Sequence, residues 1–372
     1  MLLGSACKKG AQRKSEITGI LKLLDGYDKH VSSKLLLIHE RDWWWHISQQ
    51  GGSNSLGGFT GLHGAAYLGI VEIARALLGI REWDLNAVDV EGNTAFAWAA
   101  RKGREDVVKM LLGRQGVDPD TTNTDGRTPL LLAAAFGHVG VVEMLLERID
   151  VDSDRRDKYG QTPLFRAAWA GNERVAGILL ERGDVNPNIA NNGGQTPLFG
   201  AAREGHGGVA KMLLERSDVS PNIANHNGRT PLFIAAREGH EGVVKMLLER
   251  RDVGPNTADK YGQTPLFVAA GKRHEGVVKI LLGRRDVNPD TADRYCRTPL
   301  FIAALEGHEE VVKMLLERGD ADPNTADKYD QTLLFIAAKK GHEGVVKMHW
   351  NERMSTPILR INMVKHRSSS PP

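Results

Sequence analysis

The sequence contains little cysteine, few aromatic residues and no long hydrophobic run. Its two cysteines, Cys7 and Cys296, lie far apart and fit no metal-binding spacing. So few thiols are typical of a reducing compartment, and we expect a cytoplasmic or nuclear protein. No apolar stretch approaches the 18 residues that a membrane helix needs, so no membrane partner is expected. Residues 1–9 are too short, and too soon basic, for a signal peptide.

The chain also has no large excess of charge of either sign. The chain has 49 basic and 46 acidic residues, a formal net charge of +3, without a long run of either sign. A dedicated nucleic-acid binder usually carries a basic stripe, so direct binding of nucleic acid is not expected. Aromatic residues make up only 6% of the chain, which leaves Ala, Val and Leu to form thin, regular layers.

What the sequence does contain is a threonine every 34 residues. Because a fixed period of this size marks a stacked repeat protein, we predict about nine 34-residue repeats in place of two or three globular domains. Six of the nine threonines open a Thr-Pro-Leu triplet. The series is Thr60, Thr94, Thr128, Thr162, Thr196, Thr230, Thr264, Thr298 and Thr332.

The repeat that starts at Thr230 predicts two short helices and a loop. Thr230 is expected to cap the first helix, Pro231 fits its first position, and Gly239 fits its left-handed end. The apolar spacing within 243–248 predicts a second helix with one buried face. The Pro-, Asn- and Gly-rich residues 251–262 predict an extended segment with a tight turn at its tip, called the finger from here on.

These motifs resemble the ankyrin repeat, whose pattern is Gly-x-Thr-Pro-Leu-His-x-Ala-Ala, then Gly, then Val-Val-x-x-Leu-Leu. The resemblance covers about residues 55–350. It implies an all-α solenoid of helix-turn-helix units with β-hairpin-like fingers. It also implies a protein-binding scaffold without catalysis, cofactor or metal, and we expect a monomer.

The chain departs from the ankyrin pattern in three ways. Its period is 34 where 33 is usual, and the surplus residue falls between Leu180 and Asn186. The pattern's histidine survives only as His63; six later repeats carry phenylalanine there, and we expect those rings to form a stacked ladder along the array. Glycine is replaced in two fingers and after one first helix, at Cys296, Asp330 and Arg273.

The two ends lack the repeat. Residues 1–54 predict a helical N-terminal cap or remnant that closes with a Gly/Ser linker, since GGSNSLGG lacks the Gly-Lys-Ser/Thr ending of a phosphate loop. Trp43, Trp44 and Trp45 are interpreted either as a cover for the first repeat or as a partner site. Residues 351–372 are expected to be a disordered tail.

Residue types that could carry chemistry recur with the same period. Histidines stand once per repeat, about one layer apart, so they cannot converge on a metal. The aspartates before the finger turns are interpreted as turn formers. No Ser/His/Asp or Cys/His arrangement stands outside the repeat, and we expect no enzyme. The residues are His138, His206, His240, His274, His308, His342 and Asp157, Asp259, Asp293, Asp327.

The resemblance places partner binding on the concave side, at the finger tips and the exposed ends of the first helices. Phe136, Tyr159 and Trp169 are expected to lie close together on adjacent repeats, either as a contact site or as a patch packed beneath the fingers. The full set of candidate partner-binding residues is Phe136, Tyr159, Trp169, Arg203, Arg237, Tyr261, Tyr295 and Tyr329.

Two functional hypotheses follow. The first is a non-catalytic scaffold for a protein partner, and residues 59–78 resemble the first repeat of the ankyrin arrays in fungal NACHT-type signalling proteins. The second is a nuclear regulator that contacts a transcription factor or DNA, a possibility kept open by the basic positions Arg101, Lys102, Lys339 and Lys340.

Overall fold

The computed structural model describes residues 58–79 and 84–355. The predicted N-terminal cap, its tryptophan run and most of the predicted tail therefore lie outside the described residues. The chain divides into two compact units, residues 1–192 and 193–372, and each is described by itself.

Unit 1 consists of four helix pairs in its described part. In each pair a first helix begins directly after a periodic threonine, and a second helix follows after a short turn. The helices are α4 (Gly61–Leu68), α5 (Val71–Leu78), α6 (Ala95–Arg101), α7 (Glu105–Leu112), α8 (Pro129–Phe136), α9 (Val139–Leu146), α10 (Pro163–Ala170) and α11 (Glu173–Glu181).

The described part of unit 2 consists of five pairs of the same kind. Its last helix continues to Ser355, five residues beyond the predicted end of the array. The helices are α12 (Pro197–Glu204), α13 (Gly207–Glu215), α14 (Pro231–Glu238), α15 (Glu241–Glu249), α16 (Pro265–Gly271), α17 (Glu275–Leu282), α18 (Pro299–Glu306), α19 (Glu309–Arg318), α20 (Leu333–Lys340) and α21 (Glu343–Ser355).

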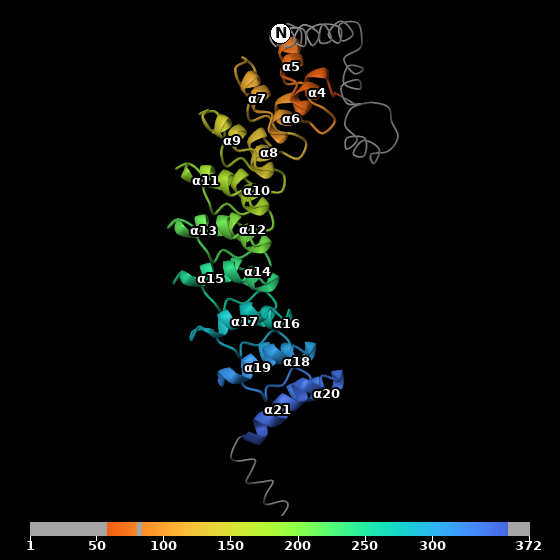
Figure 1. Cartoon of the computed structure of the whole chain (residues 1–372), viewed down its shortest axis with the longest axis vertical. Coiled ribbons are helices and arrows are strands. Elements are labelled where there is room, and N and C mark those ends of the chain that lie inside the picture. Colours follow the sequence, from red (N-terminus) through yellow and green to blue (C-terminus); the bar gives the residue numbers. More distant parts are fainter. Residues whose placement is uncertain (1–57, 80–83, 356–372) are drawn as a thin grey trace, which may run out of the picture. The chain divides into compact units, whose positions relative to one another are not determined.

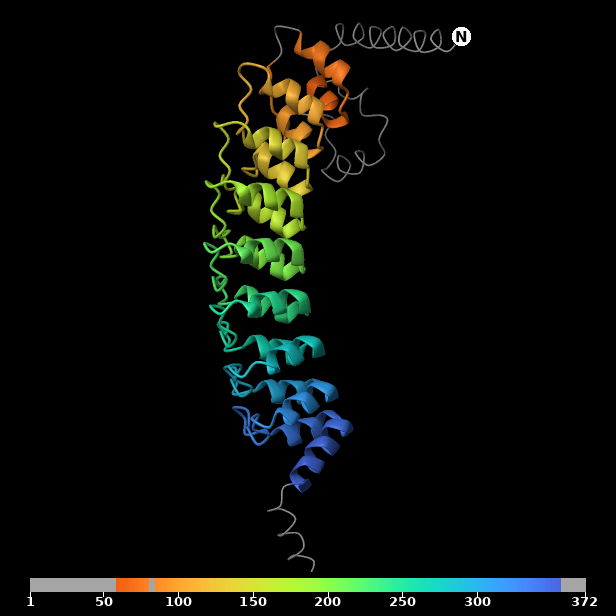
Figure 2. The same ribbon diagram turned by 60° about the vertical axis from the view of Figure 1, so that its left-hand side comes forward.

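Each unit is a stack in which like helices pack on like. In unit 1, α4, α6, α8 and α10 pack in succession, and so do α5, α7, α9 and α11; in unit 2 the same holds for α12 to α20 and α13 to α21 (Figure 1). Within each unit the fingers run along one side of the helices (Figure 2). The predicted fold class, an all-α repeat solenoid, is confirmed, although the fingers of the described part form turns and isolated bridges in place of regular strands.

The periodic threonines start the first helices as predicted. In eight of these nine helices the hydroxyl of the threonine accepts a hydrogen bond from the backbone N–H three residues further along the chain. The Thr230 hydroxyl, for example, lies 3.2 Å from the nitrogen of Phe233. At Thr60 the hydroxyl lies instead 2.8 Å from Nδ1 of His63. Such a cap contributes about 1 kcal/mol per helix, so the repeated threonine specifies the register of every pair.

The core of each layer is formed by the paired alanines of the first helix and the Val-Val-x-x-Leu stripe of the second. The phenylalanine that replaces the motif's histidine joins this core, with 0–3% exposure at Phe165, Phe199, Phe233, Phe267 and Phe301. Phe335, in the last repeat, is 52% exposed because no further described layer covers it. These rings are therefore buried in every repeat that carries them except the last, while stacking of one ring on the next stays a prediction.

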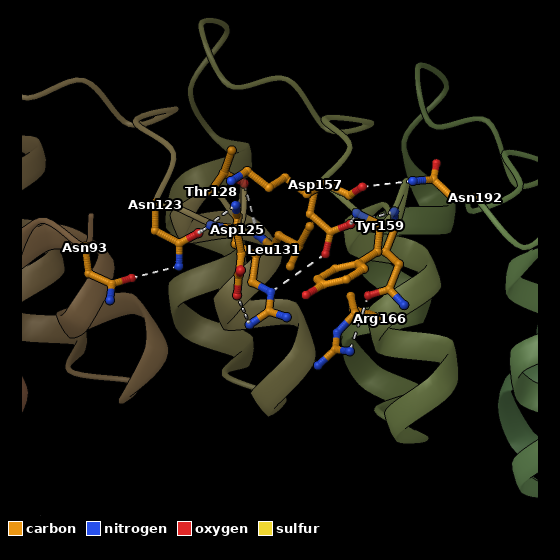
Figure 3. Close-up of polar contacts among 12 residues, drawn as sticks. Asn93, Asn123, Asp125, Thr128, Leu131, Asp157, Tyr159, Arg166 and Asn192 are labelled. Carbon is orange, nitrogen blue, oxygen red and sulfur yellow. Dashed lines mark hydrogen bonds and ion pairs between the residues drawn. The ribbon is translucent and has the colours of Figure 1, made fainter. Parts of the chain in front are cut away.

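The fingers are held together by one side chain and one backbone hydrogen bond per repeat. Asp157 Oδ1 accepts the N–H groups of Tyr159 and Gln161, at 2.9 and 2.8 Å, and so closes the turn (Figure 3). The N–H of Lys158 then donates to the carbonyl of Asp125 in the preceding finger at 2.8 Å. The prediction that the periodic aspartates form turns is confirmed.

The three replaced glycines keep the backbone of the repeat. Arg273, Cys296 and Asp330 have φ of 59–60°, and the structure gives no other non-glycine residue a positive φ within its described part. A left-handed conformation costs such residues about 1–2 kcal/mol, so packing of the neighbouring layers outweighs the local preference.

The link that contains the surplus residue carries a forked ion pair. Arg182 Nε and Nη2 donate to the two carboxylate oxygens of Asp184 at 2.8 and 2.7 Å, and Nη1 donates to the carbonyl of Leu146 in the preceding layer. The hydrogen bond to Arg182 holds the pKa of Asp184 below its usual range. The link therefore ties the end of one second helix to the next layer.

Candidate functional site

The periodic histidines have structural partners. His240 precedes α15, and its Nε2 lies 3.0 Å from the carbonyl oxygen of Arg203 at the end of a first helix in the preceding layer. Equivalent contacts join His138 to Arg101, His274 to Arg237, His308 to Gly271 and His342 to Leu305. In the part of the chain that the structure describes, no three His, Cys, Asp or Glu side chains are placed to hold a metal.

His63 forms the polar bridge that the other repeats have lost. It is buried, its Nδ1 accepts the N–H of Thr60 at 3.1 Å, and its Nε2 lies 3.0 Å from the carbonyl oxygen of Asn93 in the next finger. Burial lowers its pKa, which keeps the ring neutral and suited to one acceptor and one donor. Phenylalanine, which occupies this position in later repeats, cannot make these hydrogen bonds and contributes apolar contact instead.

Three aspartates with raised pKa values, Asp120, Asp154 and Asp290, would be candidates for acid–base chemistry, but their setting is structural. Burial raises the pKa of Asp120 and of Asp154, although each accepts one backbone N–H of the next layer at 2.8 Å. The other carboxylate oxygen of each is buried without a partner. The equivalent Asn256 uses both ends of its amide: Oδ1 accepts from Asn288, and Nδ2 donates to the carbonyl of Asp286 at 2.6 Å.

We predict that Asp120→Asn and Asp154→Asn each stabilise the fold by about 1 kcal/mol at neutral pH, because the amide supplies the missing donor. Because folding raises the pKa of both carboxyl groups, the wild-type groups stabilise the fold most at a pH below their unfolded-state pKa. This contribution to stability is lost as the pH rises through their folded-state pKa. The gain from the amides should therefore shrink as the pH falls toward about 4.

Urea unfolding of both variants between neutral and acidic pH checks this prediction. The reverse change, Asn256→Asp, is the matched control and should destabilise at neutral pH. A gain in stability that is the same at every pH would contradict the view that the ionised carboxylates of Asp120 and Asp154 cause the loss.

The exposed ends of the first helices in unit 1 form the first candidate surface. The guanidinium of Arg101 lies 4.9 Å from the ring centre of Trp98 and 5.5 Å from that of Phe136, while Lys102 lies 4.2 Å from the ring of Tyr67. Trp98 and Tyr67 are buried beneath the cations, whereas Phe136 is 53% exposed. We call these five residues the helix-end surface; cations held over rings are common at binding surfaces.

Tyr159, in its finger turn, and Arg166, on α10, lie further along unit 1 (Figure 3). Tyr159 is 53% exposed, with the guanidinium of Arg127 5.9 Å from its ring. Arg127 pairs with Asp125 at 3.1 Å and approaches Asp157 at 3.7 Å. Burial, and then Arg127, lowers the pKa of Arg166, whose Nη1 donates to Gln161 at 3.4 Å.

The three residues expected to cluster in unit 1 have different neighbours. The ring of Phe136 stacks on His138 at 6.3 Å, and Trp169 stacks on Phe165 of its own helix at 5.8 Å. Tyr159 faces Arg127, as above. Trp169 is half-buried, so it combines packing with exposure, and the choice between contact site and packed patch stays a prediction.

The candidate residues of unit 2 divide into two kinds. Arg203 and Arg237, at the ends of first helices, lie 3.5 and 3.8 Å from the carboxylates of Glu204 and Glu238, so their charge is partly balanced. Tyr261, Tyr295 and Tyr329 stand at the tips of three successive fingers and are 51%, 45% and 67% exposed.

Sequence reasoning missed the partners of these tyrosines and of Phe136. Trp98 sits four residues after its threonine, where the other repeats carry Gly, Leu, Arg, Ile or Val, and this single aromatic residue was a readable signal. Arg294 and Lys328 directly precede finger tyrosines, but the sequence alone did not indicate that each would lie over the tyrosine of the preceding finger.

Comparison with known families identifies the chain. A family model described as ankyrin repeats (3 copies) matches residues 32–123, 112–191, 201–293, 251–327 and 285–348. These matches cover well over half of the sequence, and the chain belongs to the ankyrin repeat family. The resemblance on which the sequence analysis relied is thereby confirmed.

A search of curated proteins finds no relative of this chain. The similarity of residues 59–78 to fungal NACHT-type arrays therefore stays a prediction. None of the helices in the described residues is long and apolar enough to cross a membrane.

Proposed function

We propose that the chain is a non-catalytic scaffold that binds a protein partner through its first-helix ends and finger tips. Ankyrin repeats are generally protein–protein interaction modules. The observation that carries the proposal is the contrast within a repeat: caps, core and links recur from layer to layer, while the helix ends and finger tips change from aromatic to charged. Half-exposed Phe136 and Tyr159, each beside an arginine, are the side chains that best fit binding hot spots.

We predict that Phe136→Ala combined with Trp169→Ala weakens partner binding at least about tenfold, because buried aromatic anchors dominate interface energies. The helical circular dichroism should stay nearly unchanged. The measurement is quantitative affinity capture from extract of the native organism, followed by mass spectrometry, with the wild type and the double variant processed in parallel.

Ile149→Ala serves as the control, since Ile149 is a fully exposed apolar residue of the same unit outside the proposed surface. It should leave capture within about twofold of the wild type. Unfolding of the double variant would show that Phe136 and Trp169 belong to the core, and equal losses in both variants would contradict the proposed surface.

Binding of DNA is the alternative that the basic positions suggest. Arg101 and Lys102 lie over aromatic rings, an arrangement that favours a protein interface. A salt titration on duplex DNA separates the two: strong binding that weakens steeply with salt would support the nucleic-acid alternative, and a weak, shallow response would exclude it.

A further inference from the structure

Three successive fingers of unit 2 place cations and tyrosines in alternation. Arg294 lies 5.9 Å from the ring centre of Tyr261, and Lys328 lies 4.2 Å from that of Tyr295 and 4.9 Å from that of Tyr329. Lys260 occupies the same position in the first of these fingers. We call Lys260, Tyr261, Arg294, Tyr295, Lys328 and Tyr329 the tip row.

Backbone hydrogen bonds fix the register of the tip row. The N–H of Arg294 donates to the carbonyl of Tyr261, and that of Lys328 to the carbonyl of Tyr295, both at 2.9 Å. Arg294 and Lys328 are therefore each attached to the tyrosine of the preceding finger through backbone and side chain, whereas Lys260 makes only the backbone link, to Asn227. Such cations are held in place before any ligand arrives, which lowers the entropy cost of binding.

The cations of the tip row also have no acidic partner among the described residues. Within residues 193–355 most arginines pair with a carboxylate, as in the forks Arg250–Asp252 and Arg284–Asp286. The structure gives no ion pair to Lys260, Arg294 or Lys328 among the residues that it describes. Of the neighbouring carboxylates, Asp259 pairs with Arg229 and Asp293 with Arg297, while Asp327 and the exposed Asp330 stand in the last finger of the row.

The corresponding position in unit 1 shows that the charge is not required by the fold. Asn192 donates its N–H to the carbonyl of Tyr159 at 2.8 Å, the same link that Arg294 and Lys328 make in unit 2. An uncharged side chain therefore serves the structural link equally well. The cations of the tip row need another explanation.

We propose that the tip row binds an extended acidic segment of a protein partner, with one carboxylate opposite each finger. This inference rests on the proposed scaffold function and names the chemistry of its partner at unit 2. Stacked layers are about 8–10 Å apart, and an extended chain advances about 3.3 Å per residue. An acidic residue at every third position therefore meets successive cations.

A single-stranded nucleic acid fits the row less well. Bases bind by stacking on open aromatic faces, as single-strand binding proteins show. Cations already cover a face of Tyr261 and of Tyr295, so a base would first have to displace them. Carboxylates can approach the same cations from solvent without disturbing the rings.

The test is fluorescence anisotropy at low salt, using the full chain and a labelled peptide of repeated Gly-Ser-Glu triplets. A second peptide has the same composition, but its glutamates are contiguous. We expect the spaced peptide to bind at least about threefold more tightly than the contiguous one, because only the spaced peptide matches the fingers. A labelled thymidine oligonucleotide is the third probe.

Two charge-matched variants locate the binding. Lys260→Gln, Arg294→Gln and Lys328→Gln together should weaken the spaced peptide at least about tenfold, whereas Lys245→Gln, Arg251→Gln and Lys279→Gln together should change it no more than about twofold. Replacing the three tyrosines by Phe should preserve binding, because the ring alone holds the cation. Circular dichroism confirms that each variant is folded.

Several results would overturn the inference: no binding of the spaced peptide, no preference over the contiguous peptide, equal losses in the two lysine–arginine variants, or tighter binding of the oligonucleotide. These outcomes concern unit 2 alone. If the chain still captures a protein partner through the helix-end surface of unit 1 but does not bind the spaced peptide, the scaffold function stands. Only the inference of an acidic segment is then overturned.

Discussion

Phe233→Ala is expected to destabilise the fold by about 3–5 kcal/mol, whereas Phe335→Ala costs less than about 1 kcal/mol. The two phenylalanines occupy the same position of the repeat, each directly before Ile-Ala-Ala and each donating its N–H to the capping threonine. They differ in exposure, 0% against 52%. The difference in cost therefore measures stacking between layers and not helix propensity.

Urea unfolding followed by circular dichroism gives both values, and the slope of the transition should stay the same in both variants. Since layers of a repeat protein interact mainly with their neighbours, hydrogen exchange should show the loss concentrated around α14 in the first variant. Equal costs at the two positions would mean that Phe335 is covered by a part of the chain beyond the described residues.

The same pair shows what the sequence could predict. The threonine period, the Thr-Pro-Leu start and the apolar stripes specify helices and burial because these depend on spacing along the chain. Phe335 carries the same motif as Phe233, yet its exposure depends on whether another layer follows. Position within the stack, not the local sequence, decides its burial.

The candidate site was less predictable for a related reason. Exposed tyrosines could be placed at the finger tips because the turn motif fixes them. Their cation partners come from a finger 33 residues further on, as Arg294 does for Tyr261, and this offset becomes visible only when adjacent fingers are built. Phe136 was located at a helix end, but its contact with Arg101 likewise crosses from one layer to the next.

A buried ion pair in the fingers has a neutral counterpart in the same chain. Asp259 closes its turn with Oδ1, and Arg229 of the preceding finger donates to Oδ2 at 3.2 Å; the carboxylate is fully buried. One repeat earlier the same two positions hold Gln195 and Asn225, and Asn225 Oδ1 closes the turn in the same way. Arginine likewise accompanies Asp157, whereas Asp293 faces Gln263 and pairs instead with Arg297 of its own finger.

We predict that Arg229→Gln alone destabilises by about 2–3 kcal/mol, because it leaves a buried carboxylate without its cation. Adding Asp259→Asn should recover most of that loss, since the double variant reproduces the neutral pair of the preceding repeat and keeps the Oδ1 acceptor. Asp259→Asn alone should cost about 1 kcal/mol, as the arginine then loses a charged acceptor.

A double-mutant cycle on the free energy of unfolding measures the coupling between the two positions. The reverse cycle on Gln195 and Asn225 is the matched control: Asn225→Asp alone should destabilise, and Gln195→Arg should rescue it. Additive effects in both cycles would show that the turn tolerates an unpaired carboxylate. In that case the pairing of residue types between adjacent fingers would have no energetic basis in the buried ion pair.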